Sequence, residues 1–181
     1  MSPLEGSAVE LARAAMLAYQ RGEMSTAEHG FRAASQQFAQ NGEELQAAEA
    51  ANNLCVVLLQ AERPHEALEC VRETPAIFEH HQNLALAAQA YGNLGSAQEG
   101  CGRLPEAEAA YLRSLDLFRS LRDSEGESLI LQRLAQVQLR QGQPIGALAS
   151  MQASLEAAPR RGVIQRCVRR LLSLPGRYLS G

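Results

Sequence analysis

The sequence contains no Trp and no Lys, and aromatic residues make up only 4% of its 181 positions. Because all 17 basic residues are Arg, chemistry that needs a lysine amine is excluded, such as a Schiff base, a lysine base or a phosphate-loop lysine. With so few aromatics, much of the 46% apolar share is Ala and Leu, which are strong helix formers. The composition therefore predicts an all-α protein, and the length suits a single domain.

The cysteines and the N-terminus lack the patterns of a secreted or metal-binding protein. No CxxC pair and no metal-ligand spacing occurs among Cys55, Cys70, Cys101 and Cys167. We interpret these scattered cysteines as reduced thiols in a reducing compartment. Residues 1–16 have no basic region of the kind that opens a signal peptide, and no apolar run approaches the length of a membrane span. We expect a soluble, cytoplasmic protein.

Catalytic motifs are also missing. The sequence contains no HExxH, no GxSxG and no paired carboxylates that stand apart from its many helical Glu residues. The stretch from Gly92 to Gly95 is not a phosphate loop, because no strand precedes it and no Lys follows. His80 and His81 are adjacent, so they point to different faces of a helix and are poorly placed to chelate a metal. We predict a protein that is not an enzyme and uses no metal or cofactor.

A 40-residue period runs through the chain without insertion or deletion. Its anchors are Ala27, Ala67, Ala107 and Ala147. Four residues after each anchor stands a large residue: Phe31, Val71, Tyr111 or Met151. Twelve residues before each anchor stands a small residue: Ala15, Cys55, Gly95 or Ala135. The small residue is expected to let a second helix pack tightly against the first, so each period predicts a hairpin of two helices.

The predicted helices are bounded by Gly and Pro. They cover residues 5–21 and 24–40, 43–61 and 64–80, 84–101 and 104–121, and 124–141 and 144–157, with a last helix over 161–173. Gly22, Gly102 and Gly142 are C-cap candidates, and Glu62 takes this place in the second repeat. Pro75 falls inside the helix predicted over 64–80, and it should kink or end that helix because proline lacks a backbone donor.

This pattern resembles the tetratricopeptide repeat. The matching residues are Tyr91, Leu94, Gly95, Gly102, Ala107 and Tyr111. The usual unit has about 34 residues, and the longer unit here is similar to the repeats of kinesin light chains and cell-polarity adaptors. The resemblance implies a right-handed α-solenoid in which residues 1–181 form one domain. The expected repeats are 5–40, 43–80, 84–121 and 124–158, and a C-terminal capping helix is expected over 161–173.

The resemblance also implies a peptide-binding groove on the concave side, lined by a stripe of the first helix of each repeat. The second position of this stripe forms a ladder of Arg13, Asn53, Asn93 and Arg133. An Asn amide pairs with both groups of a peptide unit, and an Arg fork suits a carboxylate. The candidate residues are Arg13, Gln20, Asn52, Asn53, Gln60, Gln89, Asn93, Arg133, Gln136 and Arg140. We predict an adaptor or scaffold that binds an extended segment of a partner protein.

Charge is unevenly distributed along the chain. Residues 159–181 carry six Arg and no acid, whereas residues 1–158 carry 11 Arg and all 20 acids, a formal charge of −9. The acidic body disfavours nucleic acid as a partner. The stripe on the first helices holds Arg13, Arg133 and Arg140 against a single acid, Glu49, so a partner with acidic groups is expected. The basic C-terminal helix is interpreted as a cap, and its alternatives are docking on an anionic membrane or nucleic acid. Self-association through the ends of the array is a further alternative.

Overall fold

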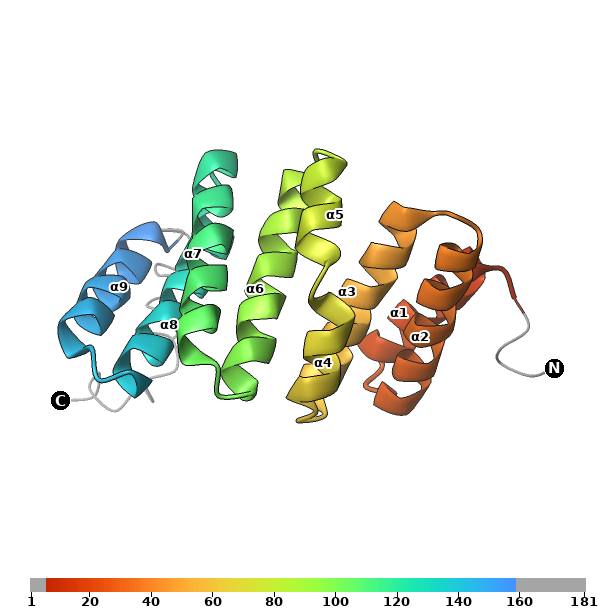
Figure 1. Ribbon diagram of the computed structural model, residues 1–181, viewed down its shortest axis with the longest axis horizontal. Helices are drawn as coiled ribbons and strands as arrows, with labels where there is room; N and C mark the ends of the chain where they lie inside the picture. Colours follow the sequence, from red (N-terminus) through yellow and green to blue (C-terminus); the bar gives the residue numbers. More distant parts are fainter. Residues whose placement is uncertain (1–5, 159–181) are drawn as a thin grey trace, which may run out of the picture.

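The computed structural model describes residues 6–158, and within them nine helices and no strand are found (Figure 1). The helices are α1 (Ala8–Gln20), α2 (Met24–Gln40), α3 (Glu44–Gln60), α4 (Pro64–Val71), α5 (Thr74–His80), α6 (Leu84–Gly100), α7 (Leu104–Leu121), α8 (Ser124–Arg140) and α9 (Pro144–Ala157). These bounds agree with the predicted ones to within three residues at every end except inside 64–80. The helix predicted over 161–173 lies outside the described residues.

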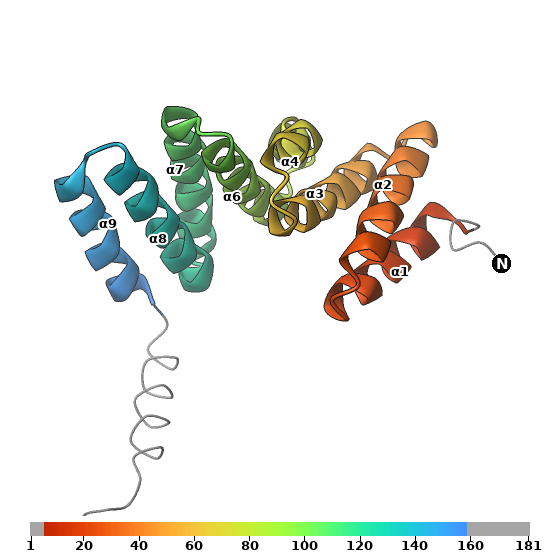
Figure 2. The ribbon, with the colours of Figure 1, turned by 90° about the horizontal axis from the view of Figure 1, so that it is seen from below.

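Consecutive helices pair as antiparallel hairpins, and the hairpins stack in a row with α1 and α9 at its two ends (Figure 1). Turned by 90°, the row forms a curved, open array rather than a closed bundle (Figure 2). The first helices of the second, third and fourth repeats are spatial neighbours, because α3 contacts α6 and α6 contacts α8. The predicted all-α solenoid of helical hairpins is confirmed.

One turn geometry connects each pair of consecutive helices except α4 and α5, and it recurs every 20 residues. At the end of α1 the Gly22 N–H donates to the Tyr19 carbonyl (3.0 Å), and the Glu23 N–H donates to the Ala18 carbonyl (2.9 Å). This pair of bonds is the Schellman motif, whose central residue has positive φ. The central residues are Gly22, Gly42, Glu62, Gln82, Gly102, Arg122 and Gly142. The predicted glycine caps are confirmed, and Glu62 adopts the same left-handed conformation with φ 56°.

The second helix of the second repeat is broken in two. Helix α4 ends at Val71, and α5 begins at Thr74 with Pro75 in its first turn. The Thr74 hydroxyl donates to the Val71 carbonyl (3.1 Å), which occupies an acceptor that the broken helix leaves without its usual partner. The interruption expected from Pro75 is confirmed, and proline is tolerated where it stands because it opens a new helix.

The core lies inside and between the hairpins, where small residues meet large ones. The Tyr111 ring packs directly on Gly95, so that a Cβ atom at Gly95 would lie only 2.7 Å from two ring carbons. The Tyr111 hydroxyl donates to Glu99 Oε2 (3.0 Å) and lies 3.0 Å from Ser96 Oγ. Burial raises the pKa of Tyr111 above its ordinary value, so this phenol stays neutral. The small-residue position therefore sets the spacing between the two helices, as predicted.

Candidate functional site

A cavity of about 300 Å³, called the central pocket below, lies across α3, α6 and α8. Its lining residues are Asn52, Asn53, Val56, Gln89, Gly92, Asn93, Ser96, Phe118, Leu129, Ile130 and Arg133. Five of the ten candidate residues are among them. The shared position of these five arises because equivalent residues on neighbouring first helices are 40 positions apart and face the same side of the array.

The amides of Asn52 and Asn93 are joined to each other. Asn93 Nδ2 donates to Asn52 Oδ1 at 3.0 Å, and Asn52 is buried while Asn93 is half-buried. No described residue pairs with the remaining amide oxygen of Asn93 or with the amide nitrogen of Asn52. The bond between α3 and α6 therefore holds one donor and one acceptor in place at the pocket, where a ligand backbone needs both.

Arg133 supplies the positive charge of the central pocket. Its side chain is exposed on α8, and it makes no ion pair with another described residue. The positive charge is close enough to Tyr111 to oppose the rise in the pKa of that phenol, although burial dominates. The apolar part of the wall is formed by Val56 of α3 and by Leu129 and Ile130 of α8. The pocket thus combines amides, a guanidinium and an apolar wall.

The other five candidate residues lie outside the central pocket. Gln60 Nε2 donates to the Tyr19 hydroxyl at 2.7 Å, and Arg140 is ion-paired with Glu99 at 3.0 Å. These two side chains connect neighbouring first helices in the array. The remaining three are exposed on the first helices at either end of the array: Arg13, Gln20 and Gln136. Of the predicted ladder, Asn53, Asn93 and Arg133 line the central pocket, and Arg13 does not.

Sequence reasoning missed part of the lining of the pocket. Phe118 and Ile130 border the cavity from α7 and α8, and neither is among the ten candidate residues. Gly92 was not singled out as a site residue, although a Cβ atom there would lie 3.1 Å from Ile130 Cδ1. The small size of Gly92 therefore leaves room above Ile130. The 40-residue period could have indicated Gly92 as a lining residue, because Gly92 stands 40 residues after Asn52.

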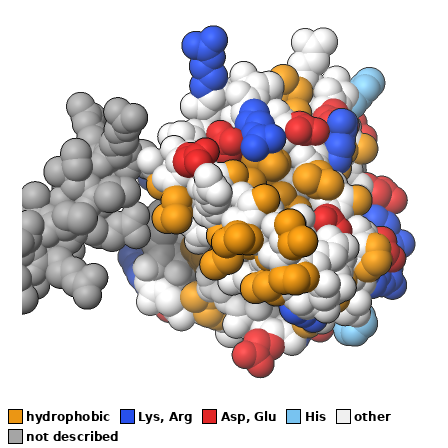
Figure 3. Space-filling model, turned by 90° about the vertical axis from the view of Figure 1, so that its left-hand side faces the viewer, with side chains coloured by type: hydrophobic (Ala, Val, Ile, Leu, Met, Phe, Trp, Pro, Cys, Tyr) orange, Lys and Arg blue, Asp and Glu red, His pale blue; other side chains and the backbone are white. Residues whose placement is uncertain are grey.

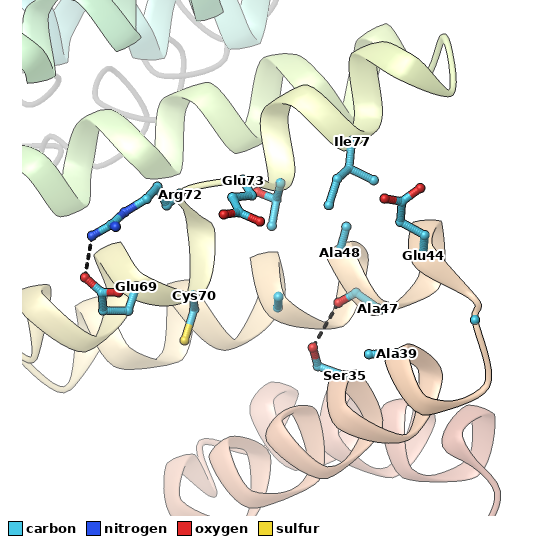
Figure 4. A pocket seen from close by; sticks show the side chains of 13 residues that line it. Ser35, Ala39, Glu44, Ala47, Ala48, Glu69, Cys70, Arg72, Glu73 and Ile77 are labelled. Atoms are coloured by element: carbon cyan, nitrogen blue, oxygen red, sulfur yellow. Dashed lines mark hydrogen bonds and ion pairs between the residues drawn. The ribbon is translucent and has the colours of Figure 1, made fainter.

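A larger cavity of about 410 Å³ lies on another part of the molecule, beside the broken helix (Figure 4). It is bordered by side chains of α2, α3, α4 and α5, including Ala39, Ala47, Cys70 and Ile77. At its edge Arg72 is ion-paired with Glu69 (2.5 Å). None of the ten candidate residues lines it. We attribute this hollow to the interruption between α4 and α5, which leaves the second helix of this repeat shorter and bent.

The described residues show no alternative centre for metal or thiol chemistry. Within residues 6–158 no group of three His, Cys, Asp or Glu side chains is arranged to hold a metal ion. Cys55, Cys70 and Cys101 are free thiols, and burial raises the pKa of Cys55 to about 12. Among the described helices, none combines the length and apolar character of a membrane span.

The fold and this site define a class, the α-solenoids built of stacked helical hairpins. Residues 86–160 match the family model of the tetratricopeptide repeat. The match covers part of the third and all of the fourth predicted repeat, and the resemblance stated from the sequence pattern is confirmed. Among curated proteins, none matches the sequence at a significant level.

Solved structures with the same architecture extend the comparison over most of the chain. BtubC (BKLC) from P. vanneervenii superposes with a TM-score of 0.77 at 22% identity, covering 87% of this chain and 64% of that one. A Rap protein in complex with competence and sporulation factor superposes with a TM-score of 0.72 at 15% identity, covering 87% of this chain and 44% of that one. Aspartyl phosphate phosphatase F from Bacillus subtilis superposes with a TM-score of 0.74 at 11% identity, covering 90% of this chain and 42% of that one. The chain thus spans less than two thirds of these proteins, and the likeness concerns the fold.

Proposed function

We propose that this protein is a non-catalytic adaptor that binds an extended segment of a partner protein along the first helices of its repeats. The observation that carries the proposal is the central pocket, where Asn93 and Asn52 are held by their mutual hydrogen bond beside Arg133. Support of a general kind comes from the tetratricopeptide match and from the Rap structure, which was solved with a competence and sporulation factor.

The chemistry of the pocket suggests the form of the ligand. The amide groups of Asn53 and Asn93 suit a peptide backbone, because an amide donates and accepts at once. Arg133 suits a carboxylate, to which a guanidinium gives two parallel hydrogen bonds. The apolar wall at Val56 and Leu129 suits an apolar side chain. The ligand class is therefore an acidic segment with an apolar residue near its carboxylate.

A displayed library of random 12-residue peptides, selected on the full-length chain, tests the proposal. Selected peptides should be enriched in Asp and Glu, and their Kd is measured by fluorescence polarisation. Asn93→Ala and Arg133→Ala should each weaken binding about tenfold, because each removes a hydrogen-bonding partner worth about 1–2 kcal/mol. Asn53→Ala should weaken it less, because no hydrogen bond to another described side chain holds that amide in place, whereas Asn93 is bonded to Asn52. Raising the salt concentration should also weaken binding.

Matched controls lie in the turns between helices. Asn41→Ala and Arg103→Ala change an exposed Asn and an exposed Arg away from the pocket, and they should leave Kd unchanged. If Asn53→Ala, Asn93→Ala and Arg133→Ala all bind the selected peptides as the wild type does, the pocket is not the binding site. Selection of basic rather than acidic peptides would contradict the proposed role of Arg133.

A further inference from the structure

The cavity of about 410 Å³ beside the broken helix, called the break pocket below, takes no part in the proposed function. Helix α3 lies between α2 on one side and α4 and α5 on the other, and it contributes Ala47, Ala48 and Ala51 to the lining. These alanines give the pocket an apolar floor. At the α9 end of the array, hydrophobic side chains gather on the surface (Figure 3), whereas the break pocket combines its apolar floor with a charged rim (Figure 4).

The rim of the break pocket carries more negative than positive charge. Glu44, Glu69 and Glu73 line it together with a single base, Arg72. Arg72 is ion-paired with Glu69, and Glu44 Oε2 lies 3.3 Å from Nε2 of His81. Within residues 6–158, Glu73 forms no ion pair. Its exposed carboxylate lies beside Ile77, with Glu44 on the other side (Figure 4). The rim therefore favours a cationic group.

The next groove along the array, between α5 and α7 and over α6, is filled by the protein's own side chains. Forty residues after Ala39, Ala51 and Glu73 stand Glu79, Tyr91 and Arg113. The Tyr91 hydroxyl donates to Glu79 Oε2 at 3.3 Å, and Arg113 is ion-paired with Glu79 at 3.1 Å. The Arg113 guanidinium also lies 5.8 Å from the centre of the Tyr91 ring. This groove thus holds a guanidinium beside a carboxylate and over an apolar surface.

The break pocket lacks the two groups that fill its neighbour. Ala51 leaves open the position of the Tyr91 ring, and Glu73 puts a carboxylate where Arg113 supplies a guanidinium. We propose that the break pocket binds an Arg side chain from a basic segment of a partner protein. The guanidinium pairs with Glu73, because its planar fork matches a carboxylate. The methylene groups of the same side chain cover the alanines of α3.

A protein segment suits the break pocket better than a small cation does. The rim is exposed at Glu44, Glu69 and Glu73, so a chain can extend along it from one carboxylate to the next. No residue lines both the break pocket and the central pocket, and the two have opposite charge preferences. The proposal therefore does not depend on the central pocket, and the two sites can be tested separately.

NMR titration of the isotope-labelled full-length protein tests the proposal. The probe is a capped nine-residue peptide, Gly-Ser-Gly-Leu-Arg-Leu-Gly-Ser-Gly. The backbone amide signals of Ala47, Ala51 and Ile77 should shift and reach saturation. The same peptide with Gln in place of Arg should bind at least about fivefold more weakly, because it loses the charged hydrogen bonds. N-acetyl-arginine amide should also bind at least about fivefold more weakly, because it cannot extend along the rim.

Two pairs of matched variants locate the site. Ala51→Tyr places a ring where the next groove has Tyr91 and should abolish the saturable shifts, whereas Ala85→Tyr, at an exposed alanine of α6 outside the pocket, should not. Glu73→Ala should raise the Kd at least about threefold, and Glu106→Ala, at an exposed Glu of α7, should leave it unchanged. In Glu73→Ala the preference for the Arg peptide over the Gln peptide should shrink. The spectrum of each variant also reports whether it is folded.

Several outcomes would overturn the proposal. Equal binding by the wild type and a folded Ala51→Tyr protein, or equal affinity for the Arg and Gln peptides, would show that the pocket does not hold the guanidinium. Equal affinity for N-acetyl-arginine amide would assign the pocket to a small cation. Shifts that follow the protein concentration would identify a second copy as the occupant. Peptide binding that appears only after the six Arg of residues 159–181 are changed to Gln would identify the chain's own segment instead.

Discussion

Replacement of Gly95 by Ala tests whether the closeness of α6 and α7 depends on a missing side chain. A Cβ atom at Gly95 would lie 2.7 Å from the Tyr111 ring, whereas ordinary contacts begin at 3.4 Å. The ring must therefore move by about 0.7 Å, the difference between these two distances. Tyr111 is completely buried and its hydroxyl is tied to Glu99, so it cannot make room cheaply.

The expected change in the free energy of unfolding is the sum of one stabilising and two destabilising contributions. Ala is favoured over Gly inside a helix by about 1 kcal/mol. Overpacking of a filled core costs about 1–3 kcal/mol. Displacement of the Tyr111 hydroxyl from Glu99 costs about 1 kcal/mol more. The sum predicts that Gly95→Ala lowers the free energy of unfolding by about 2 kcal/mol, which corresponds to a fall in Tm of about 4–8 °C.

The measurement is thermal and urea unfolding followed by circular dichroism at 222 nm, with Gly146→Ala as the matched control. Gly146 lies inside α9, and a Cβ atom there would meet only Gln138 at ordinary distance, so this variant should gain about 0.5–1 kcal/mol. In the double variant Gly95→Ala/Tyr111→Phe, which copies the Ala15–Phe31 pair of the first repeat, the two costs should not add. A Gly95→Ala protein as stable as Gly146→Ala would refute the reasoning.

The remaining predictions concern a turn and an ion pair. Gln82 has φ 56°, so Gln82→Gly should stabilise the protein by about 0.5–1 kcal/mol, measured by urea unfolding, whereas Gln36→Gly inside α2 should destabilise it. Although burial alone raises the pKa of Glu28, the guanidiniums of Arg32 and Arg63 outweigh it and hold that pKa below its ordinary 4.5. A lowered carboxyl pKa stabilises the fold above pH 4.5, and the contribution disappears as the pH falls through the folded value. The advantage of the wild type over Glu28→Gln, about 1 kcal/mol at pH 7, should therefore shrink below pH 4.5, and a constant difference would contradict this assignment.

Most of the fold could be predicted because its determinants are local and repeated. A register of four alanines 40 residues apart, with a large residue four positions later, defined every hairpin. Gly22 and its equivalents marked turns, since positive φ favours Gly. The position of the break before Thr74 could be predicted from the sequence, but the structure of the chain at the break could not. Sequence indicated that Pro75 interrupts a helix, while the structure shows that the chain restarts a helix there and leaves a cavity beside it.

The candidate site was predictable only in part. The sequence placed Asn53, Asn93 and Arg133 on one face by counting, because a period of 40 returns equivalent residues to the same side of the stack. It did not show that Asn93 is bonded to Asn52, that Arg140 is ion-paired with Glu99, or that Gln60 reaches Tyr19. Those contacts depend on the rotation and separation of neighbouring helices, which are set by packing.

The sequence by itself therefore determined the class of the fold, the bounds of its helices and the residues that share a face, because each follows from spacing along the chain. The tertiary structure decided which of the candidate residues meet in the central pocket and which are already paired elsewhere. It also decided that Met151 lies exposed while its counterparts Phe31, Val71 and Tyr111 are buried. The physical reason is the same for all three: burial and pairing depend on the neighbouring helix, and the distance to that helix is set by side chains as small as Gly95.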